Sequence, residues 1–170
     1  MKPTLVLLHG LLNDERVWEP VASRLRQRAD ILVPNLSRQD SIAQMSRDAW
    51  AEVADVPADT PLVLAGFSMG GYVAQQMLAD APRRVAALAL VDTSCRPEPP
   101  ENIPVREATM AALQRDIGAE TLAILRRGVH ADQLSNAPLM ALGLRIMREV
   151  GATAAIRQIQ AIIGRADHRA

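Results

Sequence analysis

The fold is decided by the stretch Gly66-Phe67-Ser68-Met69-Gly70. A short apolar run precedes it, and residues with helical spacing follow it. A strand, a sharp turn and a helix are therefore predicted, which is the setting in which Gly-x-Ser-x-Gly forms a nucleophile elbow. Such a turn is too tight for side chains at its two glycines, and it presents the serine hydroxyl at the carboxyl end of a sheet. The alternative interpretation is an ordinary glycine-rich turn between a strand and a helix.

Short unbroken apolar runs recur along the first half of the chain, and such runs are typical of strands covered on both faces. They occupy residues 4–9, 29–33, 61–66 and 85–91. The segments between them show apolar residues at helical spacing, which predicts helices. The residues that mark these helices are Val17, Val21 and Leu25; Ile42, Met45, Ala49 and Val53, with Asp40 or Ser41 as the N-cap; and Val73, Met77 and Leu78.

Alternation of strands and helices with short connections predicts an α/β fold with a doubly wound parallel sheet. We expect the spatial order second, first, third, fourth, within a core spanning residues 1–95. The fourth strand, residues 85–91, would then form an uncovered apolar edge, and such an edge favours self-association.

The sequence changes character after the fourth strand. A turn-rich linker, residues 96–100, contains three prolines, and residues 104–164 contain no strand-like run. Three or four short helices are predicted there, so residues 96–170 are interpreted as a helical cap and tail. The residues expected to separate these helices are Gly118, Gly128, Pro138, Gly143 and Gly151.

Composition narrows the function classes. Basic and acidic residues balance at 19 each, which argues against a surface for nucleic acid or anionic membranes. No run approaches the ~20 apolar residues of a membrane span, and a single cysteine, Cys95, permits no disulfide within the chain. A cytoplasmic protein is predicted. The three histidines show no metal-binding spacing and no nucleotide-binding motif occurs, so no cofactor is predicted.

The loop after the first strand, His9-Gly10-Leu11, is expected to end beside the elbow, because the carboxyl ends of parallel strands share one edge of the sheet. The backbone N–H groups of Leu11 and Met69 could then form an oxyanion hole. His9 is interpreted as a structural residue that holds this loop; the alternative is a general base.

Four stretches resemble the α/β-hydrolase superfamily, in particular its small capped esterases and C–C hydrolases. They are residues 7–10, Val17-Trp18, residues 64–71 and residues 88–93. The resemblance covers about residues 3–95, and residues 100–164 are similar in placement to the family's cap. It implies that Ser68 is the nucleophile, with support from His9, Gly10, Gly66 and Gly70, and that the substrate is a small acyl compound.

The resemblance also implies a triad in the order serine, acid, histidine. The family usually places the last two after further strands, and about 60 to 80 residues of a usual domain would follow Ala170. Within the chain, Asp92 at the end of the fourth strand is an alternative acid. His130 and His168 are alternative bases, and Cys95 is an alternative nucleophile interpreted as an idle thiol.

Three hypotheses about function follow from these residues. The first is a serine hydrolase that acts on an ester, lactone, thioester or C–C bond through a Ser68 acyl-enzyme, with acid and base from beyond Ala170. The second is a catalytically degenerate module that keeps a binding pocket. The third is a non-functional fragment.

Overall fold

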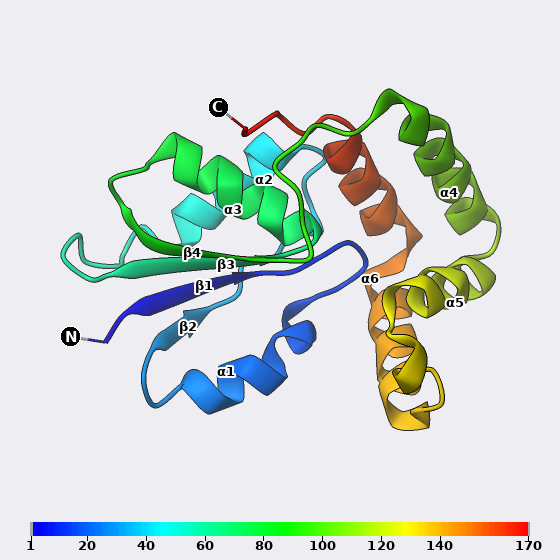
Figure 1. The fold of residues 1–170 in the computed structure, drawn as a ribbon, viewed down its shortest axis with the longest axis horizontal. Helices are drawn as coiled ribbons and strands as arrows, with labels where there is room; N and C mark the ends of the chain where they lie inside the picture. Colours follow the sequence, from blue (N-terminus) through cyan, green and yellow to red (C-terminus); the bar gives the residue numbers. More distant parts are fainter. Residues whose placement is uncertain (1, 170) are drawn as a thin grey trace.

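The computed structural model describes residues 2–169, and its centre is a four-stranded parallel sheet in the order β2-β1-β3-β4 (Figure 1). The strands are β1 (Thr4–Leu8), β2 (Asp30–Leu32), β3 (Leu62–Phe67) and β4 (Val85–Val91). All three pairings are parallel. The predicted fold class, strand positions and strand order are confirmed.

Helices cover both faces of the sheet, which explains why most strand residues are apolar instead of alternating with polar ones. On one face, α2 (Ile42–Glu52) and α3 (Met69–Asp80) pack on a buried cluster that includes Val6, Leu8 and Leu64. On the other face, α1 (Glu19–Leu25) packs on Leu7. Figure 1 shows α1 on one side of the sheet and α2 and α3 on the other.

The predicted apolar face of the first helix is wrong at Val21, whereas Val17 packs against the buried cluster on this side of the sheet. A 3-10 turn, η1 (Glu15–Val17), comes first, and α1 begins only at Glu19, with a proline in its first turn. This break shifts the buried face to Trp18 and Ala22 and leaves Val21 41% exposed. In α2, the N-cap is Ser41, one of the two predicted candidates, and its hydroxyl accepts a hydrogen bond from the Gln44 N–H.

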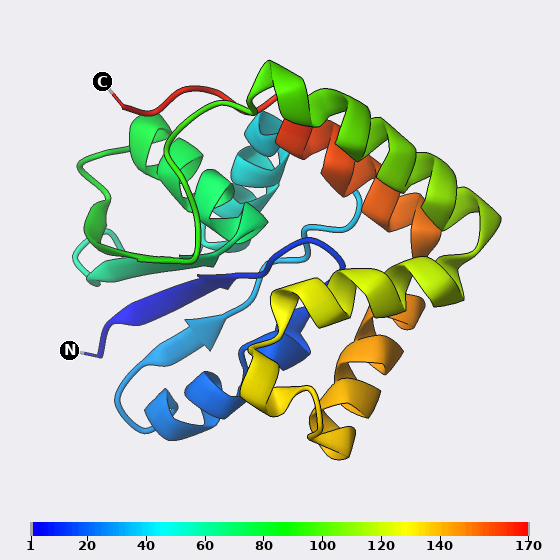
Figure 2. The same ribbon diagram turned by 45° about the vertical axis from the view of Figure 1, so that its right-hand side comes forward.

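A helical layer lies beyond the carboxyl ends of the strands (Figure 2). Its elements are η2 (Pro100–Asn102), α4 (Ile103–Arg115), α5 (Ile117–Gly128), η3 (Ala131–Gln133) and α6 (Ala137–Ile163). The predicted break at Gly143 is wrong, because α6 continues through this residue. The predicted break at Gly151 is confirmed, since its φ of 81° is not helical and divides α6 into two helices. Among residues 2–169, no helix combines the length and the apolar character needed to cross a membrane.

The helical layer shares its apolar core with the sheet. Leu12, in the loop after β1, is buried in one cluster with residues of α4, α5 and α6. Near the end of α6, Ala161 and Ile162 belong instead to the main core, which lies between the sheet and helices α2 and α3. The helical layer therefore packs directly on the loop after β1.

An ion cluster holds the two chain segments that lead into and out of the helical layer. Glu98 pairs with Arg106 at 3.0 Å and with Arg165, and both members of the Glu98–Arg165 pair are buried. Burial disfavours the charged carboxylate, but hydrogen bonds from the two guanidinium groups hold the Glu98 pKa below its ordinary value. Arg165 also donates to the Arg96 carbonyl and lies 4.4 Å from the centre of the Tyr72 ring.

The sheet ends at β4, whose outer edge and part of whose surface are uncovered in the described residues. Val85 and Leu88 pack against the main core, whereas Leu90 and Val91 are each 46% exposed. The expected apolar edge is thus present.

We propose that this edge pairs with a second copy of the 170-residue chain, because exposed strand edges offer unpaired backbone groups and β4 adds apolar side chains. Light scattering should show a mass that rises above 18.5 kDa with concentration. Leu90→Lys should reduce this association, since charged side chains protect strand edges. Val105→Lys on α4, which replaces a side chain 64% exposed away from the edge, is the control. Equal effects of the two substitutions would contradict edge pairing.

Candidate active site

Ser68 lies in a tight turn between β3 and α3, with φ 51° and ψ −116°. Few residues other than glycine adopt this conformation, so the surrounding packing must hold it. A Cβ atom at Gly66 would lie 2.4 Å from the Gly70 carbonyl oxygen, and one at Gly70 would lie 2.0 Å from the Leu8 carbonyl oxygen. Both glycines are therefore required by close backbone approach.

The end of β4 braces the turn from the other side. The Ser68 N–H donates to the Val91 carbonyl at 3.0 Å, and the Thr93 hydroxyl donates to the Ser68 carbonyl at 2.8 Å. The Thr93 side chain also occupies the space next to Gly71, where a Cβ atom would lie 2.5 Å from it. The strained backbone of Ser68 is thus fixed at its N–H and at its C=O.

Two backbone N–H groups near Ser68 lack acceptors within residues 2–169. Met69 is the first residue of α3, where an N–H has no partner inside the helix. The Leu11 N–H, in the loop after β1, has no hydrogen bond to any described residue. Gly10 brings this loop close to the elbow, since a Cβ atom at Gly10 would lie 3.3 Å from the Ser68 Cβ atom. The helix start adds a partial positive charge on the same side.

A cavity of about 390 Å³ opens over Ser68, between the ends of the strands and the helical layer. Ser68, Leu11 and Asp92 line it on the side of the sheet. Apolar residues line it on the side of the helical layer: Ile124, Leu125, Val129, Leu139, Leu142, Ile146 and Met147. A largely apolar chamber lined by Ser68 and Leu11 suits the acyl part of a small substrate.

A larger and more open hollow of about 830 Å³ lies between α4 and α5. It shares Leu11, Ile124 and Gly128 with the chamber over Ser68, but Ser68 does not line it. We base the site on the smaller chamber because it contains the hydroxyl group and the apolar walls.

His9 is buried beneath the loop, and both ring nitrogens are occupied. Its Nε2 atom accepts a hydrogen bond from the Leu36 N–H at 3.2 Å, so Nδ1 carries the proton and donates to the Gly10 carbonyl at 3.0 Å. Burial lowers the pKa of the imidazole, against smaller opposing effects of Gly10, Asp14 and Glu15. These bonds are those of a residue that supports the loop.

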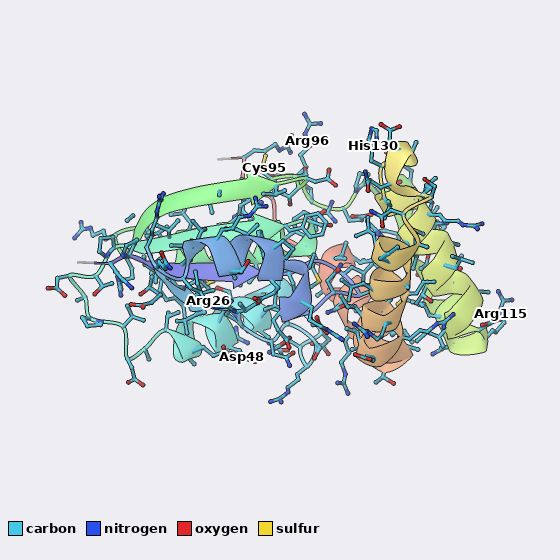
Figure 3. All side chains as sticks on the ribbon, turned by 90° about the horizontal axis from the view of Figure 1, so that it is seen from below. Arg26, Asp48, Cys95, Arg96, Arg115 and His130 are labelled. Atoms are coloured by element: carbon cyan, nitrogen blue, oxygen red, sulfur yellow. The ribbon has the colours of Figure 1, made fainter. Side chains whose placement is uncertain are left out.

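The other two histidines lie away from the chamber. His130 caps η3, at the far end of the helical layer, and Figure 3 shows it beside that tip. The His168 N–H donates to the Cys95 carbonyl at 2.8 Å, beside the linker. Among residues 2–169, no histidine lines the chamber around Ser68.

Asp92 and Cys95 follow β4 closely but differ in placement. Asp92 has φ 46° and lines the chamber together with Ser68. Cys95 is exposed, lies next to Arg96 in Figure 3 and does not line the chamber. The described residues contain no group of three potential metal ligands.

Sequence reasoning missed several residues that shape the site. Leu12 has φ 58°, and no motif marks it. Thr93 ends the stretch 88–93, but its contact with the elbow was not predicted. Gln158 contacts the loop after β1 from α6, across 146 positions of sequence. Leu12 and Gln158 are wholly buried. The only available signal was a glutamine inside an apolar helical segment.

Comparisons with known proteins agree with this geometry. The sequence matches the alpha/beta hydrolase family over residues 5–164. It is 29% identical over 147 residues to the pimeloyl-[acyl-carrier protein] methyl ester esterase of Aromatoleum aromaticum, which covers 80% of this chain and 58% of that protein. The esterase of the same name from Pseudoalteromonas atlantica is 37% identical over 98 residues, which cover 54% of this chain and 38% of the relative. The chain thus spans less than two thirds of the length of these curated relatives.

Solved structures show the same fold at low identity. A thermophilic esterase from Thermogutta terrifontis superimposes with a TM-score of 0.84 at 19% identity, over 98% of this chain and 65% of that protein. The enol-lactonase from Burkholderia xenovorans gives 0.81 at 20% identity, over 98% and 67%. The protein belongs to the alpha/beta hydrolase family.

Gly70→Ala tests the packing of the elbow. The added methyl group would lie within 2.0 Å of the Leu8 carbonyl oxygen, so we expect the free energy of unfolding to fall by about 3 kcal/mol or more. Urea unfolding measures it. Gly128→Ala at the end of α5 is the control, because nothing lies within 4 Å of the added atom and the change should stay within about 1 kcal/mol. Similar stabilities of the two variants would contradict the close approach.

The neutral state of His9 predicts a pH dependence of stability. Because burial lowers its pKa, the unfolded chain binds this proton more tightly than the folded protein does. The resulting stability is fully present above about pH 6.5 and is lost as the pH falls below that value. Urea unfolding at pH 7.5 and 5.5 should show this loss, and His9→Asn should reduce it. His130→Gln, at a side chain 77% exposed, is the control; an unchanged loss in His9→Asn would refute the assignment.

Proposed function

We propose that the protein is a serine esterase in which Ser68 attacks the carbonyl carbon of a small acyl substrate. The Leu11 and Met69 N–H groups hold the oxyanion of the tetrahedral intermediate. When this intermediate collapses, the alcohol leaves with a proton from the general acid, and the acyl group stays on Ser68 until water hydrolyses it. One observation carries this proposal: a serine in a strained elbow opens into an apolar chamber beside two N–H groups without acceptors.

No described residue at the chamber is placed as a general base for Ser68. A serine hydroxyl needs such a base, because its own pKa lies far above neutrality. We propose that the histidine, and the acid that orients it, come from outside the 170 residues, and that Asp92 is an alternative acid because it lines the same chamber. The greater length of the curated relatives supports this proposal.

The substrate class is argued from the chamber and the relatives. The apolar residues of α5 and α6 favour an aliphatic acyl group, and in this role the helical layer acts as a cap. The named relatives act on a methyl ester of an acyl chain attached to a carrier protein, and the Burkholderia protein acts on an enol-lactone. We therefore propose an aliphatic ester or lactone as substrate, with no cofactor, and a cytoplasmic location.

Fluorophosphonate labelling and hydrolysis of a short-chain p-nitrophenyl ester test this function. In the natural protein, Ser68 should be the labelled residue, and Ser68→Ala should lower kcat at least about 1,000-fold because no acyl-enzyme can form. Ser135→Ala, at an exposed serine before α6, is the matched control. The 170-residue chain alone should turn over far more slowly than the natural protein. Full turnover by Ser68→Ala would overturn the proposal, and ligand binding without labelling would favour a binding module.

A further inference from the structure

A buried amide side chain from α6 reaches the loop that carries Leu11. The Gln158 Oε1 atom accepts a hydrogen bond from the Leu12 N–H at 2.9 Å, and its Nε2 atom donates to the Leu36 carbonyl at 3.1 Å. Gln158, Leu12 and Leu36 are all fully buried. One side chain of the helical layer therefore joins the loop after β1 to the loop after β2.

These bonds continue into the contacts of His9. The Leu36 carbonyl accepts a hydrogen bond from Gln158, and the Leu36 N–H donates one to the His9 ring. His9 in turn donates to the Gly10 carbonyl. A continuous hydrogen-bonded path thus runs from Gly10 through His9, Leu36 and Gln158 to Leu12.

This path fixes both peptide groups that flank Leu11. The Gly10 carbonyl and the Leu11 N–H belong to one planar peptide group, so the bonds from His9 and from the Asn13 N–H to that carbonyl set the direction of the Leu11 N–H. The next peptide group is held at its carbonyl by the Asn13 side chain, at 2.8 Å, and at the Leu12 N–H by Gln158. Of the polar groups in these two peptide groups, the Leu11 N–H alone has no partner among residues 2–169.

The conformation of Leu12 shows why this anchor is needed. Its φ of 58° lies in the left-handed region, which is costly for a residue with a branched side chain. Without Gln158, its buried N–H would also lose its acceptor. The loop would then relax, and the direction of the Leu11 N–H would change with it.

We propose that Gln158 is a positioning residue of the oxyanion hole, through which α6 of the helical layer sets the direction of the Leu11 N–H. The inference rests on the proposed function, because it assumes that Leu11 stabilises an oxyanion. It couples the walls of the chamber to the chemistry, since the same helix also contributes Ile146 and Met147 to the chamber.

Gln158→Leu in the natural protein tests this role, because leucine fills similar space and makes no hydrogen bond. We expect kcat for the p-nitrophenyl ester to fall about 10- to 100-fold, with KM within about threefold, since the oxyanion forms only in the transition state. Thr121→Val is the matched control: this buried hydroxyl of α5 bonds only to carbonyls of its own helix, Ile117 and Gly118. Equal losses of kcat in both variants would overturn the proposal, as would an unchanged kcat in Gln158→Leu.

Amide hydrogen exchange gives a readout that does not depend on activity, and its first part uses the wild-type protein alone. In the wild-type protein, the Leu12 amide should be protected and the Leu11 amide should exchange faster, and Gln158→Leu should remove the protection of Leu12. An unprotected Leu12 amide in the wild-type protein would overturn the proposal. Full turnover by Ser68→Ala would instead overturn the proposed function, whereas Leu12 protection that depends on Gln158 would still support the anchor.

Discussion

The close approach of the start of α3 to the end of β1 is the constraint on which the site depends. Gly70 lies so near the Leu8 carbonyl oxygen that no side chain fits between them. This contact places the helix start against the loop after β1 and brings the Met69 and Leu11 N–H groups to one end of the sheet. The strain at Ser68 is tolerated because Val91 and Thr93 hold both sides of its peptide backbone.

The loop after β1 is supported from three directions. The His9 ring donates to the Gly10 carbonyl, and the Asn13 side chain donates to the Leu11 carbonyl. The Gln158 side chain, from α6, accepts from the Leu12 N–H. Leu12 also belongs to the apolar core of the helical layer. The helical layer is therefore part of the support for the backbone at the site, in addition to forming the wall of the chamber.

The described residues place a serine and an apolar pocket together, but they place no histidine beside that serine. Ser68, Leu11 and the apolar walls meet at one chamber, and no histidine among residues 2–169 lines it. His9 is committed to two hydrogen bonds, His130 lies at the tip of the helical layer and His168 lies beside the linker. In the proposed function, residues at the chamber bind the substrate and stabilise the oxyanion, whereas proton transfer requires a further group.

The sequence by itself determined the strands of the sheet and the position of the elbow, because apolar runs and the Gly-x-Ser-x-Gly pattern are local signals. It misplaced the buried face of α1, since Pro20 and the 3-10 turn before it shift the helix, and it divided α6 at Gly143, where the helix continues beside Leu125. Only the tertiary structure revealed Gln158, because hydrogen bonds across 146 and 122 positions leave no local pattern. The physical reason is that periodicity reports burial, whereas the partner of a buried polar group depends on how distant segments pack.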